Sequence, residues 1–144
     1  MKKALAGLGV AGTLAAIAWL GWLEWSRPPQ IWKAIAITVD YVLSPGTLAS
    51  RKLVDPAVVA SMLSSLEVTG SLHQYRPTSS DNPSRVVFHM HSGKDWTAWW
   101  RGPEHLSLEP WGELEITGAF AETLARELSR IEGKPIVPYS REGR

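Results

Sequence analysis

Cysteine is absent from this sequence of 144 residues, so disulfide bonds and a thioether-linked lipid anchor are both excluded. An excess of one sign of charge is absent as well, because the sequence has 15 lysines and arginines and 14 aspartates and glutamates. Such a balance lacks the basic field with which proteins bind nucleic acid. Internal repeats and low-complexity blocks are also missing. The composition therefore predicts no nucleic-acid partner.

Three motifs that would indicate a catalytic site are missing too. The sequence has no HExxH zinc motif, no GxSxG nucleophile turn and no glycine-rich phosphate loop. Ser92-Gly93 lacks the residues that surround a nucleophilic serine. We therefore predict a protein that is not an enzyme and has no cofactor.

The stretch that dominates the sequence is Ala4–Leu23, which contains no charge and no proline. Its length corresponds to a helix of roughly 30 Å, the thickness of the hydrocarbon layer of a bilayer. We predict a transmembrane helix over 4–23. Gly7 and Ala11, like Gly12 and Ala16, are small residues four apart, a spacing that lets two membrane helices approach closely.

The charges around this segment predict its orientation. Lys2 and Lys3 precede it, whereas Glu24 and Arg27 beyond it carry opposite charges. Short positive flanks remain in the cytoplasm. We therefore expect a cytoplasmic stub over 1–3 and an extracytoplasmic location for everything after the helix, in a single-pass protein of the cell membrane.

Tryptophans mark the outer end of the predicted helix. Trp19, Trp22 and Trp25 follow one another closely, and indole rings favour the interface between lipid tails and water. We assign these three residues to the membrane interface. An alternative is a cleaved signal peptide, because Ala16-Ile17-Ala18 has the small-x-small form of a cleavage site.

The first part of the outer region predicts a strand followed by a helix. Residues 24–30 form a spacer, because the paired prolines in it stop a helix. In Ile31–Leu43 many apolar residues alternate and β-branched residues are dense, which predicts a strand; the helical period also fits and is the alternative. Asp55 followed by Pro56 predicts the start of a helix that runs to about Leu66.

The next part predicts an antiparallel meander over Arg85–Thr117, with short alternating runs separated by glycine and proline turns. Trp99 and Trp100 must point to opposite faces of their strand. Ala98 shares the face of Trp100 and leaves room there for a packed helix. We therefore expect Trp100 in the core and Trp99 exposed.

The remaining segments complete the predicted domain. Ser71–Tyr75 is a candidate strand and Arg76–Ser84 a polar loop. A last helix begins at Thr117 or Gly118, ends at Gly133 and precedes a flexible tail over 134–144. The predicted buried stripe of this helix consists of Phe120, Leu124, Leu128 and Ile131.

Together these elements predict an α+β domain over 31–133, in the order strand, helix, antiparallel meander, helix. The matching segments are Ile31–Leu43, Asp55–Leu66, Val86–Lys94 and Ala119–Ile131. In this order they resemble small uncharacterised extracytoplasmic domains of membrane-anchored and lipoprotein-type proteins of Gram-positive bacteria. The resemblance implies a fold and a location, and no catalytic residue.

Four residues are candidates for a ligand-binding patch. Trp99 and Arg101 share the polar face of one predicted strand, where an indole and a guanidinium can bind a sugar ring or a peptide. His89 and His91 lie two apart on the neighbouring strand and therefore on one face. We predict that the four side chains form one mixed aromatic and basic patch.

A metal site is the alternative interpretation of the histidines. His73 and His105 lie on other predicted strands of the same sheet, so either could add a third ligand to His89 and His91. The predicted function is a membrane-anchored binding or sensing domain, or an accessory subunit, whose partner is a protein or a cell-wall ligand. The competing classes are an envelope metal-dependent enzyme and a structural partner that assembles through the membrane helix.

Overall fold

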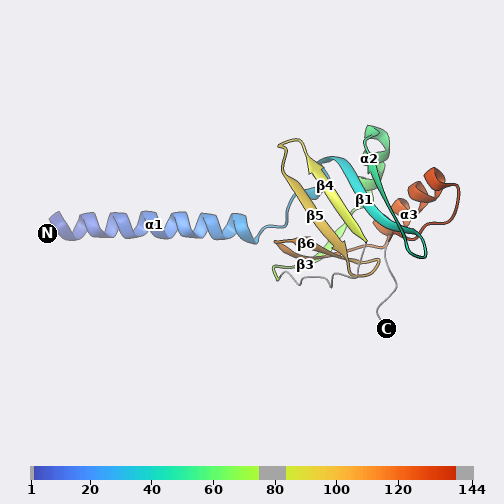
Figure 1. The fold of residues 1–144 in the computed structure, drawn as a ribbon. Helices are drawn as coiled ribbons and strands as arrows, with labels where there is room; N and C mark the ends of the chain where they lie inside the picture. Colours follow the sequence, from blue (N-terminus) through green and yellow to red (C-terminus); the bar gives the residue numbers. More distant parts are fainter. Residues whose placement is uncertain (1, 75–83, 139–144) are drawn as a thin grey trace.

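The computed structural model describes residues 2–74 and 84–138, with side chains for all of these except 2–11 and 24. A long helix, α1 (Lys2–Ser26), extends away from the domain that holds the sheet (Figure 1). The strands are β1 (Ala34–Ser44), β2 (Thr47–Leu53), β3 (Val68–Leu72), β4 (Arg85–Met90), β5 (Asp95–Trp100), β6 (His105–Glu109) and β7 (Gly112–Ile116). The helices of the domain are η1 (Ile31–Lys33), α2 (Pro56–Ser64) and α3 (Ala119–Glu132). The α+β class is therefore as predicted.

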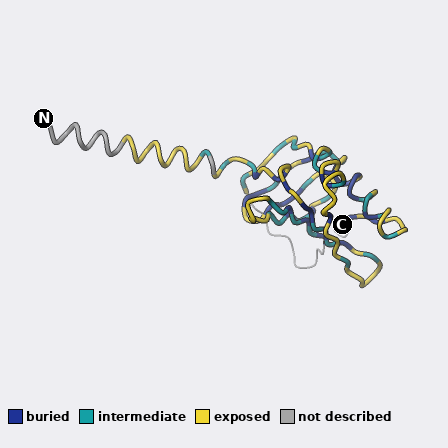
Figure 2. The backbone as a smooth tube through the Cα atoms, turned by 90° about the horizontal axis from the view of Figure 1, so that it is seen from above, coloured by how far each residue is buried: buried dark blue, intermediate teal, exposed yellow. Residues whose placement is uncertain are grey.

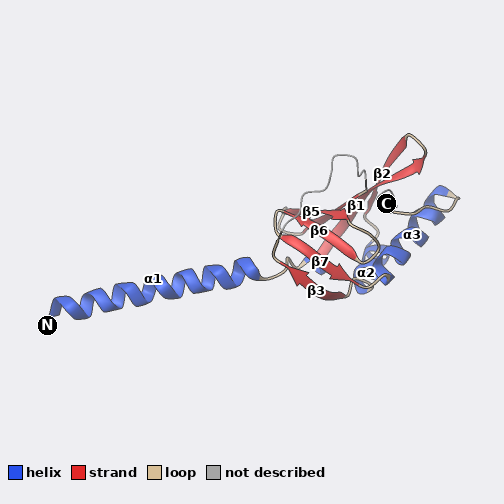
Figure 3. Ribbon diagram, turned by 90° about the horizontal axis from the view of Figure 1, so that it is seen from below, coloured by secondary structure: helices blue, strands red, loops and turns tan. Residues whose placement is uncertain are grey.

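The strands form one antiparallel sheet of seven strands in the order β2-β1-β4-β5-β6-β7-β3. Helices α2 and α3 lie together at one side of the sheet (Figure 3). Phe120 of α3 stacks on Phe88 and Trp100, with ring centroids 6.0 and 5.9 Å apart. The core of the domain thus lies between one sheet face and two amphipathic helices, where apolar burial supplies most of the stabilisation.

Strand β1 confirms the strand predicted within Ile31–Leu43, preceded by the short 3-10 helix η1. Its fully buried side chains at alternate positions are Ile37, Val39 and Tyr41. Ile35 has the same odd spacing but is 54% exposed. The reason is an irregularity in the pairing with β4 between Ala34 and Ala36, which exchanges the two faces at this point so that both alanines are buried.

Strand β2 is a correction to the predicted element order, because the sequence predicts no strand between the turn at 44–46 and Asp55. Gly46, at φ 75°, closes the hairpin, and the register pairs Thr38 with Lys52. Only Leu53 of this strand is buried. An edge strand that buries one side chain shows little apolar alternation, and so its pattern was not recognisable.

Helix α2 begins as predicted. The carboxylate of Asp55 accepts hydrogen bonds from the backbone N–H groups of Ala57 and Val58, at 2.9 and 3.2 Å. The proline at the first helical position costs nothing, because its missing N–H would have no partner there. The helix ends at Ser64, two residues before the predicted end at Leu66, and its side chains Val59 and Met62 are buried in the core, as is Leu66 beyond it.

The meander is also as predicted in its order and phase. Strands β4 and β5 form a hairpin in which Phe88 lies opposite Trp96 and Arg85 lies opposite Trp99. Strand β3 overlaps the predicted Ser71–Tyr75 but begins earlier, at Val68. The predicted loop Arg76–Ser84 lies outside the described residues except for Ser84, which is buried.

Helix α3 buries most of its predicted stripe, and Gly133 ends it in the left-handed conformation, at φ 67°. Ile131 is an exception, because it is 40% exposed near the end of the helix. The tail predicted to be flexible over 134–144 is described only as far as residue 138. Within it Ile136 is buried, and its backbone N–H donates to Ser129 Oγ of α3 at 2.9 Å.

Helix α1 contains the segment predicted to span the membrane, although the side chains of residues 4–11 lie outside the description. Over the residues that are described, no helix combines the length and the apolar character that a bilayer crossing requires. The described side chains of α1 are almost all exposed, in contrast to those of the domain (Figure 2).

Candidate functional site

The candidate site lies on the sheet face that points away from α2 and α3, which we call the open face. No described helix packs on it, and its side chains are mostly half-buried and polar. Its members in the four strands β1, β4, β5 and β6 are Thr38, Asp40, Arg85, Val87, His89, Asp95, Thr97, Trp99, His105, Ser107 and Glu109. The alternation of each strand places these residues on one surface.

Trp99 lies on the open face and Trp100 in the core, as the phase of β5 predicts. Trp100 is 1% exposed, whereas Trp99 is half-buried rather than fully exposed. The indole N–H of Trp99 points toward Glu109 Oε2, at 3.5 Å. The ring of Trp99 therefore remains partly open to a ligand and is oriented by a neighbouring carboxylate.

An ion pair that the sequence did not reveal lies next to Trp99. Arg85, which is opposite Trp99, holds Asp40 of β1 through its Nη2 and Nε atoms, at 2.6 and 2.7 Å from Asp40 Oδ2. Ser50 donates a third hydrogen bond to the same carboxylate, at 2.6 Å. Three strands thus fix the charged groups beside the indole. The alternation of β1 and β4 predicts the faces of these residues, but not their pairing.

His89 is held by both of its ring nitrogens. Its Nδ1 lies 3.0 Å from Asp95 Oδ1, and its Nε2 lies 2.8 Å from Thr38 Oγ1. A carboxylate can only accept a hydrogen bond, so Nδ1 carries the proton and, in the neutral ring, Nε2 accepts from the hydroxyl. Hydroxyl, imidazole and carboxylate therefore form one chain, as they do in acyl-transfer enzymes. The backbone of β1 at Thr38 is paired on both sides, however, so that its N–H groups offer no oxyanion site there.

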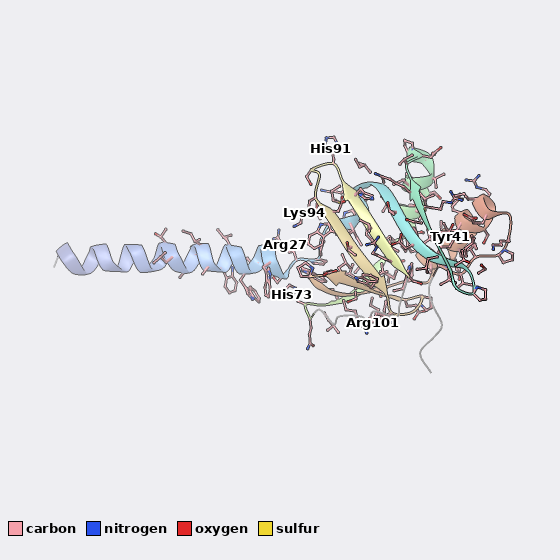
Figure 4. The ribbon with its side chains drawn as sticks, in the orientation of Figure 1. Arg27, Tyr41, His73, His91, Lys94 and Arg101 are labelled. Atoms are coloured by element: carbon pink, nitrogen blue, oxygen red, sulfur yellow. The ribbon has the colours of Figure 1, made fainter. Side chains whose placement is uncertain are left out.

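The four predicted patch residues do not come together. His89 lies opposite Asp95, and Trp99 lies four residues further along the same strand, a separation of about 14 Å. His91 follows β4 in the exposed turn, and Arg101 follows the end of β5. Figure 4 shows His91 and Arg101 at opposite ends of the domain. The open face therefore has two separate polar positions, one at Trp99 and one at His89.

The other two histidines do not complete a metal site. His105 of β6 lies opposite Glu115 of β7, two strands from His89 in the order of the sheet. His73 lies beside β3 and contacts tryptophans instead. Among the described residues, no three histidine, aspartate or glutamate side chains are close enough to hold a metal ion together.

A cluster at the junction of α1 with the domain was not predicted. The ring of His73 makes edge contacts with Trp25, at a centroid distance of 3.8 Å, and with Trp111, at 5.2 Å. The indole N–H of Trp111 donates to the backbone carbonyl of Trp25, at 3.2 Å. These contacts fix the end of α1 against the turn between β6 and β7. The sequence indicated Trp25 only as a membrane-interface residue, because contacts over this distance leave no local pattern.

No protein-family model, curated protein or solved structure matches this chain.

Proposed function

We propose that this chain is a single-pass membrane protein whose α+β domain is extracytoplasmic and binds a ligand on the open face. Uncharged residues fill the predicted anchor, and large apolar side chains of α1 point to its surface: Leu14, Ile17, Trp19, Leu20 and Trp22 are each more than half exposed. An apolar helix without a protein partner suits a lipid environment. The tryptophans at its end suit the interface.

One observation carries the binding proposal: a half-buried indole, Trp99, is held beside the fixed Arg85–Asp40 ion pair on the side that the helices leave open. An indole face with adjacent charged groups can stack on a pyranose ring while the charges bind its hydroxyls. A cell-wall glycan therefore fits this position better than an apolar ligand. A peptide is the other ligand class with the same chemistry.

The binding test uses the full chain in detergent micelles and purified cell-wall glycan fragments. We expect the Trp99→Ala variant to lose roughly five-fold or more in affinity, because the stacking of a nucleobase, a flat ring of similar size, on an aromatic side chain contributes roughly 1–3 kcal/mol. Trp32→Ala is the matched control, since Trp32 is an exposed tryptophan outside the open face. Equal affinity in Trp99→Ala and the original chain would refute the position of the site.

The anchor and the orientation need a separate test. A reporter at the C-terminus that is active only outside the cytoplasm should be active in the full chain, because Lys2 and Lys3 favour a cytoplasmic N-terminus. Activity of a cytoplasmic reporter at the same position would refute the orientation. A mature chain that begins at Trp19 would show that the segment is a cleaved signal peptide.

An enzymatic function is the second candidate. The reaction class that we propose for it is acyl transfer, whereas the histidine pattern of the sequence indicated a metal-dependent reaction. The observation that favours it is the chain of hydrogen bonds from Thr38 through His89 to Asp95. A fluorophosphonate probe would label Thr38 if His89 activates its hydroxyl, and His89→Ala would abolish the labelling. Absence of labelling in the full chain would leave His89 as a group that orders the sheet surface.

A structural role through the anchor is the third candidate. Nothing lies within 4 Å of the position that a side chain on Gly12 would occupy, so this side of α1 is open to another helix. Cross-linking in membranes should then yield a dimer that disappears in Gly12→Leu. A monomer in the original chain would refute this role.

A further inference from the structure

The end of the domain nearest to α1 carries three exposed basic side chains. Arg27 follows α1 directly, Lys33 ends η1, and Lys94 lies in the turn between β4 and β5; all three are exposed. Within the described residues, none of the three takes part in an ion pair. The ammonium of Lys94 lies over the ring of Trp96, 4.3 Å from its centroid.

These cations lie at one end of the molecule. Ala34, next to Lys33, pairs with Met90, and the backbone N–H of Met90 donates to the carbonyl of Lys94 at 3.1 Å. Figure 4 shows Arg27, Lys94 and His91 at the end from which α1 leaves. The nearby carboxylates bind other side chains, since Asp95 accepts from His89 and Glu109 of β6 lies 3.5 Å from the indole nitrogen of Trp99.

Two arginines on the other side of the domain are paired with carboxylates. Arg51 binds Glu132, and Arg130 binds Glu127, at 2.9 and 3.0 Å. The three basic residues near α1 have no such partner among the described residues. Exposed indoles, Trp25 and Trp32, accompany the cations at this end, and tryptophan next to basic residues is the composition of membrane-facing protein surfaces.

The junction with α1 determines where this end points. The hydrogen bond from Trp111 to the carbonyl of Trp25, and the ring contact between Trp25 and His73, hold the last turn of α1 against the domain. If α1 spans a bilayer, the end with Arg27, Lys33 and Lys94 must lie next to the lipid headgroups. Lysine or arginine near an anionic surface is attracted strongly enough to dock a tethered domain.

We propose that this end is a lipid-facing surface, in which Arg27, Lys33 and Lys94 bind the phosphate groups of anionic phospholipids while Trp25 and Trp32 enter the interface. This inference rests on the membrane-anchored function proposed above. Its consequence is that the domain lies against the bilayer in a fixed orientation, with the open face directed sideways rather than toward the lipid.

The test measures how close this end lies to the bilayer. The sequence has no cysteine, so Ser92→Cys in the β4–β5 turn accepts a single fluorescent donor, and Thr47→Cys in the far β1–β2 hairpin provides the control position. The full chain is reconstituted in vesicles of phosphatidylcholine with an acceptor on the headgroups, with and without phosphatidylglycerol. We expect phosphatidylglycerol to increase energy transfer from position 92 and to leave that from position 47 unchanged.

Charge variants then identify the residues. Lys33→Gln and Lys94→Gln should each lower the ratio of docked to undocked domain roughly five-fold, and added salt should do the same to the original chain. The control is Arg126→Gln with Arg130→Gln, which removes two positive charges from α3. The salt titration needs no substitution, so a variant that misfolds does not decide the result.

The outcomes separate this inference from the proposed anchor. A chain that alkaline carbonate extracts from the vesicles refutes both the anchor and the lipid-facing surface. A chain that resists extraction, but whose energy transfer from position 92 ignores phosphatidylglycerol, salt and both lysine variants, refutes only the lipid-facing surface.

Discussion

The phenol of Tyr41 donates a 2.5 Å hydrogen bond to Glu132 Oε1, across 91 residues of sequence. Arg51 binds the same oxygen through its Nε, at 2.9 Å. One carboxylate at the end of α3 therefore joins the two strands of the β1–β2 hairpin, with Tyr41 fully buried beneath it. These two hydrogen bonds connect the β1–β2 hairpin at the edge of the sheet to helix α3.

This contact predicts how stability depends on pH. The hydrogen bonds from Tyr41 and from Arg51 lower the pKa of Glu132 below its usual 4.5. A depressed carboxyl pKa stabilises the fold above the pKa of the unfolded chain, and the contribution is lost as pH falls through the folded pKa. The free energy of unfolding should therefore decrease below about pH 4.5 more steeply in the original chain than in Glu132→Gln. Urea unfolding of the full chain in micelles at several pH values measures this, and parallel curves would contradict it.

The stability of the fold at alkaline pH depends on the phenol of Tyr41. Burial, and then the hydrogen bond to Glu132, raise the pKa of Tyr41 above its usual 10.0. The protonated phenol thus stabilises the fold below pH 10, and this contribution is lost as pH rises through the raised pKa. Tyr41→Phe should be less stable than the original chain at pH 8, and the difference should narrow at high pH. The same unfolding measurement tests it, and a constant difference would exclude this role.

The cap of α2 gives a second stability prediction. Asp55→Ala removes the acceptor for the backbone N–H groups of Ala57 and Val58, which should cost on the order of 1 kcal/mol. Asp55→Asn is the matched control, because asparagine caps a helix nearly as well. Equal stability of the alanine and asparagine variants would mean that the cap does not stabilise α2.

The two adjacent tryptophans of β5 should respond differently to truncation. Trp100→Ala empties a buried site against Phe120 and should lower the free energy of unfolding by roughly 3 kcal/mol or more. Trp99→Ala removes a half-buried ring from the open face, so the loss should be roughly 1 kcal/mol or less. Thermal melting of both variants measures the contrast, and the reverse order would mean that the faces of β5 are exchanged.

Gly112 should not tolerate a side chain. Its φ is 157°, and a Cβ atom there would lie 2.3 Å from the backbone carbonyl oxygen of Leu72 in β3. Backbone cannot move aside as a side chain does, so Gly112→Ala should destabilise the domain by roughly 2 kcal/mol or more. Gly118→Ala is the control, since nothing lies within 4 Å of its Cβ position. Similar melting temperatures for the two variants would contradict the close approach of β3 to β7.

The position of Gly112 also connects two parts of the candidate architecture. It follows Trp111, whose indole binds the last turn of α1, and it allows β3 to approach β7 so that His73 reaches Trp25. A substitution at this turn should therefore weaken the contacts between the domain and α1, and it should also weaken the pairing of β3 with β7.

The local chemistry of the sequence determined several features directly. Asp55-Pro56 determined where α2 begins, and Gly133 where α3 ends, because caps depend on a few adjacent residues. Alternation determined that Trp100 is core and Trp99 is not, since the side-chain period of a strand is two. The α+β class followed from the same periodicities. The uncharged composition of Ala4–Leu23 is likewise a property of sequence alone.

Only the tertiary structure decided which residues meet. The irregular pairing between β1 and β4 moved Ile35 to the surface, and edge pairing made a strand of the polar Thr47–Leu53. Strand register separated His89 from Trp99 and brought Arg85 to Asp40 instead. Each of these features depends on contacts between segments that are distant in the sequence. Such contacts form when the gain from packing exceeds the entropy cost of closing the loop between the segments, and neither quantity produces a local sequence pattern.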